Sequence, residues 1–148
     1  CIRDRNDPAF IRHVGDRGIR DIEQARQAMR DGILKVYRDQ RMGPYGLFLH
    51  GSDTAMGICG LFKRDNLEYP DIGYALLPAF SGKGYAFEAA QAVCDHARGH
   101  MGLGRMLAIV SPDHGRSIHL LEKLGMKAGE RFRMPGEEDE LVLYGMGL

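Results

Sequence analysis

The sequence lacks tryptophan and has only three cysteines, Cys1, Cys59 and Cys94, in 148 residues. None of them belongs to a CxxC pair, and their odd number leaves one over, so neither a disulfide framework nor a zinc ribbon is predicted. Reduced thiols in this number are typical of a cytoplasmic protein. We therefore expect a cytoplasmic location and no structural metal.

The sequence also has no excess of positive or negative charge and no long apolar run. Lys and Arg total 20, Asp and Glu total 20, and the sequence pI is about 7.2, so no overall field favours nucleic acid or an anionic membrane as a partner. No apolar run approaches the roughly 18 residues of a membrane span, and no signal peptide is visible. With 44% hydrophobic and 27% charged residues, residues 1–148 are expected to form one soluble globular domain.

The first third of the sequence predicts helices. Asn6 to Pro8 has the pattern of a helix start, with an Asn or Asp cap and proline in the first turn. Apolar residues from Asp21 to Met42 recur with helical period, and Gly32 is the expected break between two helices. Because the sequence opens at Cys1 directly in helix-like sequence, we expect residues upstream of it, including an N-terminal strand.

The remainder predicts strands and two further helices. Three short apolar runs predict strands, the first two as an antiparallel pair, over Tyr45 to His50, Met56 to Lys63 and Asp71 to Leu77. An amphipathic helix over Gly84 to His100 and a buried strand over Met106 to Val110 then imply a parallel crossover. A helix from Ser111-Pro112-Asp113 to Gly125 is followed by strands over Met126 to Arg133 and Glu140 to Gly145.

The most informative stretch is Ser81-Gly82-Lys83-Gly84-Tyr85-Ala86, between a predicted strand and a predicted helix. Glycines let the backbone approach a ligand, and the unpaired N–H groups and dipole of the following helix favour an anion such as a pyrophosphate. The P-loop pattern fails because Gly84, and not Ser or Thr, follows Lys83. The dinucleotide pattern also fails, because no acidic residue stands near Gly104. A plain strand-to-helix turn is the alternative interpretation.

Two segments, IGYALLPAFSGKGYAFEAA and AIVSPDHGRSIHLLEKLGM, resemble the acyl-CoA-binding motifs of the GNAT N-acetyltransferase superfamily, in the branch similar to ribosomal-protein N-terminal acetyltransferases. The resemblance runs from about Asn6 to the C-terminus. It implies an α/β (α+β) fold with a mixed, mostly antiparallel central sheet, a parallel pair of splayed strands and helices on both faces. Acetyl-CoA is the implied cosubstrate.

The resemblance also implies cofactor contacts. The family's pyrophosphate loop, Arg/Gln-x-x-Gly-x-Gly/Ala, aligns with Ser81, Gly84 and Ala86, and Ser81 departs from it. The implied donors are the backbone N–H groups of Gly82, Lys83, Gly84, Tyr85 and Ala86. In the second motif His114 replaces the usual asparagine, while Ser117 is kept. The pantetheine arm is expected beside the strand end at Leu76 and Leu77.

Acyl transfer needs a neutral amine, a site for the oxyanion and a proton for the departing thiolate. Glu68 and Asp71 are the candidate bases, although both have the alternative interpretation of solvated turn residues. Ser117 or Tyr144 are the candidate proton donors, with Ser117 favoured by the resemblance, and backbone N–H near Leu77 is the expected oxyanion donor. Tyr69 and Tyr74 are interpreted as packing residues. His96 and His100 have i, i+4 spacing, but no third ligand follows, so no metal is predicted.

Three functions remain open on the sequence. The first is an acetyl-CoA-dependent N-acetyltransferase whose partner is an amine, a protein N-terminus or a small molecule. The second is a non-catalytic acyl-CoA sensor of the same fold, suggested by the departures at Ser81 and His114. The third is a structural domain with a fortuitous glycine turn. The sequence does not distinguish a monomer from a homodimer.

Overall fold

The computed structural model describes residue 11, residues 18–134 and residues 139–148. The predicted helix start at Asn6 to Pro8 and residues 135–138 lie outside them. The helical elements are α3 (Ile22–Ala28), η1 (Met29–Ile33), α4 (Leu34–Gln40), η2 (Pro78–Phe80), α5 (Tyr85–Gly99) and α6 (Gly115–Lys123). The strands are β1 (Pro44–Phe48), β2 (Ala55–Phe62), β3 (Asp71–Leu76), β4 (Arg105–Val110), β5 (Lys127–Arg133) and β6 (Glu140–Gly147).

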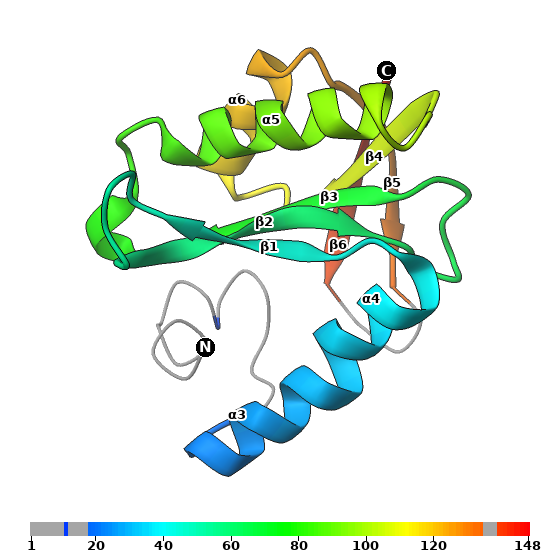
Figure 1. The fold of residues 1–148 in the computed structure, drawn as a ribbon. Helices are drawn as coiled ribbons and strands as arrows, with labels where there is room; N and C mark the ends of the chain where they lie inside the picture. Colours follow the sequence, from blue (N-terminus) through cyan, green and yellow to red (C-terminus); the bar gives the residue numbers. More distant parts are fainter. Residues whose placement is uncertain (1–10, 12–17, 135–138) are drawn as a thin grey trace.

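The six strands form one sheet in the order β1-β2-β3-β4-β6-β5 (Figure 1). Every neighbouring pair is antiparallel except β3 and β4, which are parallel and joined through α5. A parallel pair needs such a crossover, because a tight turn cannot reverse the chain twice. The predicted mixed, mostly antiparallel sheet is confirmed.

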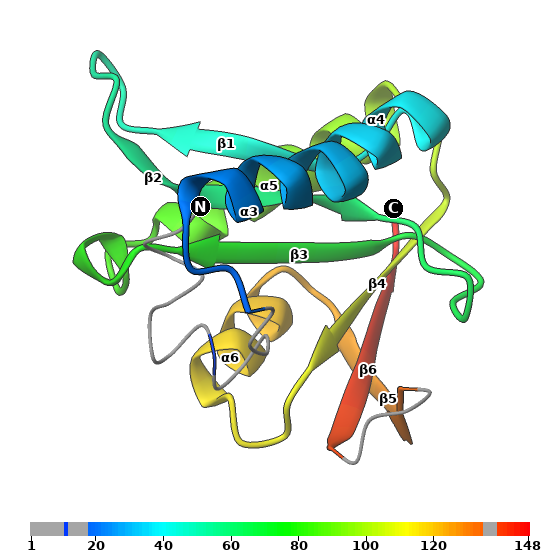
Figure 2. The ribbon, with the colours of Figure 1, turned by 90° about the horizontal axis from the view of Figure 1, so that it is seen from below.

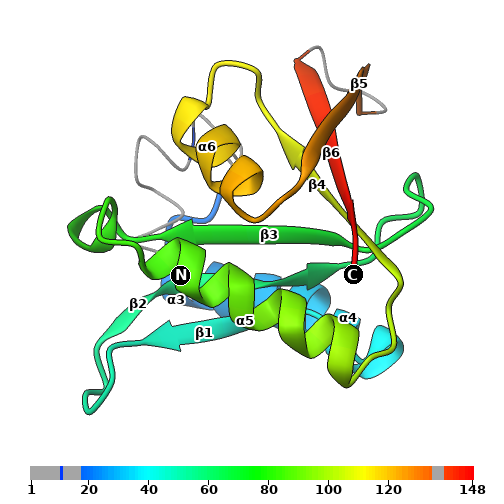
Figure 3. The ribbon, with the colours of Figure 1, turned by 90° about the horizontal axis from the view of Figure 1, so that it is seen from above.

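Strands β3 and β4 pair only at one end. Their register contains a single pair, Asp71 with Leu107, where the N–H of Leu107 donates to the carbonyl of Pro70 at 2.9 Å. Beyond that pair the strands separate toward their carboxyl ends, and α6 lies in the angle between them (Figures 2 and 3). The predicted splay of the parallel pair is therefore confirmed.

Helix α5 covers one face of the sheet. Its buried residues Ala90, Val93, Cys94 and Ala97 follow the i, i+3, i+4, i+7 spacing of one helical face. They pack in a single core with side chains of β2, β3, β4 and α6, such as Cys59 and Leu121. Because this core fixes α5 on the sheet, it also fixes the glycine turn at the amino end of the helix.

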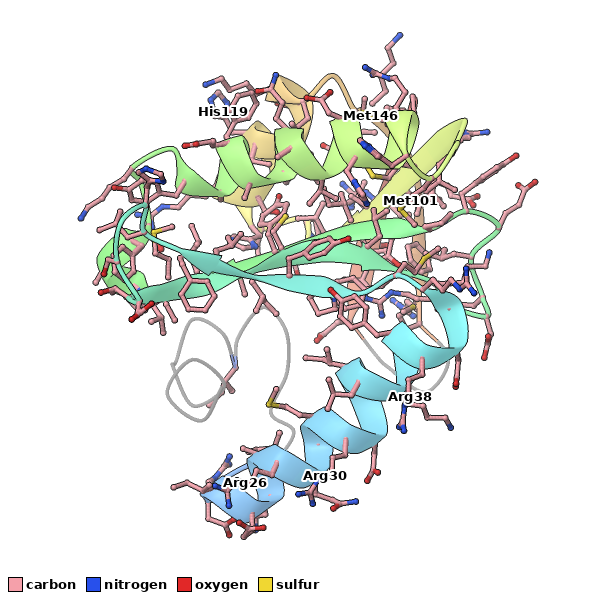
Figure 4. All side chains as sticks on the ribbon, viewed as in Figure 1. Arg26, Arg30, Arg38, Met101, His119 and Met146 are labelled. Carbon is pink, nitrogen blue, oxygen red and sulfur yellow. The ribbon has the colours of Figure 1, made fainter. Side chains whose placement is uncertain are left out.

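The α3 to α4 segment lies on the other side of the sheet from α5 (Figure 1), so helices on both faces are confirmed. The Tyr37 hydroxyl donates to the carbonyl of Pro44 at 2.8 Å and ties α4 to β1. Arg26, Arg30 and Arg38 point away from the sheet along this segment (Figure 4). None of the helices in the described residues is long and apolar enough to span a bilayer.

Two predicted boundaries need a correction. Gly32 does lie between two α-helices, α3 and α4, but they are joined without a break by a π-helical segment, where the N–H of Leu34 donates to the carbonyl of Met29. Helix α6 begins at Gly115 and not at Ser111-Pro112-Asp113, because the ψ of His114 is 65° and its N–H closes a turn on the Ser111 carbonyl at 3.0 Å. The proline and aspartate that suggested a helix cap belong to that turn.

Candidate active site

The glycine turn between β3 and α5 has left-handed backbone at both glycines. The φ of Gly82 is 75° and that of Gly84 is 87°, and Gly84 is the N-cap of α5. A Cβ atom added at either position would meet no atom within 4 Å. The conformation, rather than crowding, therefore requires glycine here, and the space in front of the turn is open.

Five successive backbone donors in this turn have no acceptor among the residues that the structure describes. Within the described part of the chain, the N–H groups of residues 82–86 make no hydrogen bond. The flanking bonds run from Ser81 N–H to the Pro78 carbonyl at 3.2 Å and from Glu88 N–H to the Gly84 carbonyl at 3.1 Å. The unpaired donors stand at the positive end of a 15-residue helix, an arrangement that binds anions.

Two lysines flank this donor group, which we call the amide cradle (backbone N–H of residues 82–86). The Lys83 ammonium lies 5.9 Å from the centroid of the Phe80 ring. The Lys123 ammonium lies 4.3 Å from the centroid of the Phe87 ring and brings a positive charge from α6 to the first turn of α5. Both positive charges complement a phosphate group. The turn therefore has cationic groups nearby even though Ser81 stands where the resembled motif has Arg or Gln.

The N–H of Leu77 is not available for an oxyanion. It donates to the carbonyl of Met56 on β2 at 2.8 Å, so an assignment to Leu77 itself is wrong. Because successive N–H groups of a strand point to opposite edges, the N–H of Leu76 points toward β4, where the strands have separated. The N–H of Leu76, next to Leu77, is thus a backbone donor that faces the opening between β3 and β4.

A pair of hydroxyl groups joins β3 to α6. Tyr74 Oη lies 2.7 Å from Ser117 Oγ, and Tyr74 Oη also donates to the Ser117 carbonyl at 3.3 Å. Burial raises the pKa of Tyr74 to about 12, and the hydrogen bond with Ser117 opposes that rise. The interpretation of Tyr74 as a packing residue missed this polar contact. Only the chain's return 43 residues later creates it, and no local pattern signals it.

The two candidate bases have different surroundings. Asp71 is buried, and the Nε of Arg64 donates to its Oδ1 at 2.9 Å. Burial raises the pKa of Asp71, and the charge and hydrogen bond of Arg64 oppose that rise. Glu68 is exposed in the loop before β3, where its backbone carbonyl accepts a hydrogen bond from Lys63 Nζ at 2.8 Å. The structure therefore brings only Asp71 into the sheet, and it does so as half of an ion pair.

The other predicted groups lie on several elements of the fold. Tyr144 is 4% exposed in the core, on β6, with β4 between it and β3. His114 is half-buried at the N-cap of α6. His96 and His100 stack with ring centroids 4.9 Å apart. Across the described ranges, no group of three or more His, Cys, Asp or Glu side chains is placed to hold a metal ion.

Comparison with known proteins places the chain in a family. A family model described as an acetyltransferase (GNAT) domain matches residues 2–127. The chain belongs to the GNAT acetyltransferase family. It is therefore an acetyltransferase with acetyl-CoA as cosubstrate, and the resemblance to the superfamily is confirmed.

Relatives and solved structures agree with this assignment. The chain is 37% identical over 106 residues to "Probable N-acetyltransferase YjcK" of Bacillus subtilis, which covers 70% of this chain and 58% of that protein. The acetyltransferase from Agrobacterium tumefaciens superposes with a TM-score of 0.78 and 23% identity over 98% of this chain and 82% of its own. A spermidine N-acetyltransferase from Vibrio cholerae, in complex with CoA and spermine, gives a TM-score of 0.78 and 13% identity over 97% and 85%. At such low identities the two structures show the shared GNAT fold alone.

Proposed function

We propose that this GNAT domain transfers acetyl from acetyl-CoA directly to a primary amine, and that the amide cradle of residues 82–86 holds the pyrophosphate of the cosubstrate. The observation that supports the proposal is the set of five unpaired N–H groups at the amino end of α5. The separation of β3 and β4 beside them supports a place for the pantetheine arm. Its amide groups would pair with the strand edge that β4 leaves open.

The reaction needs one new bond and one broken bond at the acetyl carbon. The amine nitrogen attacks the thioester carbonyl, the C–S bond breaks, the nitrogen loses one proton and the thiolate gains one. We assign the Leu76 N–H to the developing oxyanion, because it faces the opening between the strands. We assign Ser117 as the proton donor to the thiolate, because it belongs to α6, the helix in the angle between β3 and β4 (Figure 3), and its Oγ lies 2.7 Å from Tyr74 Oη on β3.

The acceptor is proposed to be a protein N-terminus, as in the ribosomal-protein branch, or a small amine. An α-amine has a pKa of about 7.7 to 8.0 and is partly neutral at physiological pH, whereas a lysine amine with a pKa of about 10.4 is almost wholly charged. An α-amine therefore needs little help from a base. Asp71 is already paired with Arg64, which supports an acceptor amine that needs little help from a general base. The exposed Glu68 is the remaining candidate for that base.

The first experiment measures acetyl-CoA binding by calorimetry in the Gly84→Glu and Gly99→Glu variants. A glutamate at position 84 would place a side chain and a negative charge in front of the amide cradle, at a φ of 87°, so we expect binding to be lost. Gly99 is at the far end of the same helix and has open space around it, so its variant should keep wild-type affinity. Unchanged binding in Gly84→Glu would refute the assigned pyrophosphate site.

The second experiment measures thiol release from acetyl-CoA with a panel of peptides carrying free N-termini, lysine side chains and small amines. We expect release with at least one α-amine acceptor and faster turnover as pH rises through the acceptor pKa. Tight binding of acetyl-CoA with no turnover across the panel would support the sensor in place of the enzyme.

A further inference from the structure

Tyr74 and Ser117 make a polar contact at the point where β3 and β4 have separated. Tyr74 is three residues past Asp71, the only β3 residue in register with β4, so its strand segment borders the opening. Ser117 is the third residue of α6, the helix that lies in that angle (Figure 3). The 2.7 Å contact between the hydroxyl oxygens thus links two elements on either side of the position proposed for the thioester.

The direction of this hydrogen bond decides whether Ser117 can act as a donor. If Ser117 donates to Tyr74, the only proton of the serine hydroxyl is already used. If Tyr74 donates to Ser117 Oγ, that proton is free for a ligand, because a hydroxyl has one donor and two acceptor sites. Tyr74 Oη can alternate between two acceptors on the same residue, Ser117 Oγ at 2.7 Å and the Ser117 carbonyl at 3.3 Å.

We propose that Tyr74 is a positioning residue for proton transfer to the departing coenzyme A thiolate. Its hydroxyl holds Ser117 Oγ toward the opening and donates to that oxygen while Ser117 gives its own proton to sulfur. In that step the Oγ–H bond breaks and an S–H bond forms. Ser117 then regains a proton from water, and water takes the proton that the amine nitrogen releases. This inference rests on the proposed role of Ser117.

Tyr74 suits this task because it stays protonated. Burial raises its pKa to about 12, so the phenol keeps its proton at physiological pH and remains a hydrogen-bond donor. A serine near the start of a helix otherwise tends to bond to nearby backbone, which would turn its hydroxyl away from a ligand. The aromatic ring, anchored on β3 with the core, removes that freedom.

The test compares Tyr74→Phe with Tyr37→Phe. Each substitution removes one tyrosine hydroxyl that is hydrogen-bonded in the structure, but Tyr37 bonds to the Pro44 carbonyl on the outer strand β1. We expect Tyr74→Phe to lower kcat for thiol release about tenfold or more, with the acetyl-CoA Kd and the acceptor KM within about twofold of wild type. Tyr37→Phe should leave kcat unchanged and lower only the melting temperature.

Ser117→Ala and the double variant separate the inference from the proposed function. If Tyr74 acts through Ser117, the double variant should lose no more kcat than Ser117→Ala alone, because the two side chains act as a unit. A fall equal to the product of the two single effects would overturn the inference. A large loss in Ser117→Ala with full kcat in Tyr74→Phe would also overturn it, and the role of Ser117 would stand. Full kcat in Ser117→Ala would refute both the role of Ser117 as proton donor and the positioning role of Tyr74.

A separate control distinguishes a loss of kcat from a loss of folding. Melting temperatures are measured for all variants, and kcat is compared well below the lowest of them. If Tyr74→Phe does not fold, Tyr74→Met supplies a flexible apolar side chain of the kind that fills core gaps. A solvent deuterium isotope effect on kcat in wild type, reduced in Ser117→Ala, is the additional expected result. An isotope effect that is the same in both proteins would count against proton donation by Ser117 and thus against the inference.

Discussion

Arg64 and Asp71 form an ion pair between a half-buried cation and a buried carboxylate. Arg64 Nε lies 2.9 Å from Asp71 Oδ1, and the two side chains are 40% and 3% exposed. Asp71 also begins β3 and is the residue in register with Leu107 of β4. The ion pair therefore stands at the point from which the two strands separate, and its loss would affect the position of both.

Arg64→Ala should destabilise the protein by about 1 to 3 kcal/mol at pH 7, since it leaves a buried carboxylate without its partner. We place the effect below that of fully buried ion pairs because the Arg64 side chain is partly in water. Urea unfolding at pH 7 measures it. The matched control is Arg98→Ala, whose side chain pairs with Asp95 at 3.8 Å with both groups exposed, and which should change stability by less than about 0.5 kcal/mol. Equal losses of stability in the two variants would show that the burial of Asp71 does not increase the cost of removing its partner.

The pH dependence of stability should report the raised pKa of Asp71. Burial is the largest cause of that rise, so the folded protein holds this proton to higher pH than the unfolded chain, in which an aspartate has a pKa of about 3.9. The contribution of Asp71 to stability is thus fully present below about pH 3.9 and is lost as pH rises through the folded pKa.

The measurement is the melting temperature of wild type and Asp71→Asn from pH 4 to pH 7. We expect wild type to lose stability relative to Asp71→Asn as pH rises, because the asparagine has no proton to lose. Asp95→Asn removes a carboxylate from the exposed face of α5 and serves as the charge control. A difference between wild type and Asp71→Asn that does not change with pH, or that moves the other way, would contradict the raised pKa.

Local patterns in the sequence were sufficient for most elements. The apolar run from Met56 to Lys63 predicts β2 to within one residue at each end, and the amphipathic run from Gly84 to His100 predicts α5 equally well. Helix α5 buries one face in the core, which imposes the helical period of its sequence, whereas β2 has successive buried residues, which its apolar run reflects. The glycine turn was also predictable, because left-handed backbone at Gly82 and Gly84 requires a particular residue type.

The contacts that complete the candidate site were not predictable in the same way. The Tyr74 hydroxyl reaches Ser117 only after the chain has formed α5 and β4 and returned as α6. The start of α6 was also missed, because proline and aspartate are favoured both in helix caps and in turns such as the one that ends at His114. Side-chain pairs between distant elements depend on the register of the whole sheet, which no local period encodes.

Gly32→Ala should stabilise the protein. Gly32 lies in the π-helical segment between α3 and α4, its φ is not positive, and an added Cβ would meet no atom within 4 Å. Alanine should therefore raise the free energy of unfolding by about 0.5 to 1 kcal/mol, because it restricts the unfolded chain and favours helix. A rise of about 1 to 4 °C in the melting temperature is the expected result. A fall would show that the wider turn at this position depends on glycine.

Gly57→Ala should damage both the fold and the site, because β2 and β3 approach closely there. A Cβ at position 57 would overlap the carbonyl oxygen of Ala75 and would lie 2.8 Å from the Leu76 Cα, so the backbone of β3 would have to move. We expect a loss of about 2 kcal/mol or more in stability. Gly104→Ala, which has open space around it, is the control and should be nearly neutral.

The same substitution tests whether the carboxyl end of β3 positions the thioester. Because the displaced residues include Leu76, whose N–H faces β4, the fraction of Gly57→Ala that folds should show a lower kcat than wild type at a temperature where both are folded. Activity is normalised to the folded fraction from circular dichroism. The Gly104→Ala control should keep full kcat. A folded Gly57→Ala protein with wild-type kcat would mean that the exact position of the Leu76 backbone does not limit acetyl transfer, and the oxyanion assignment would then have to move to another donor.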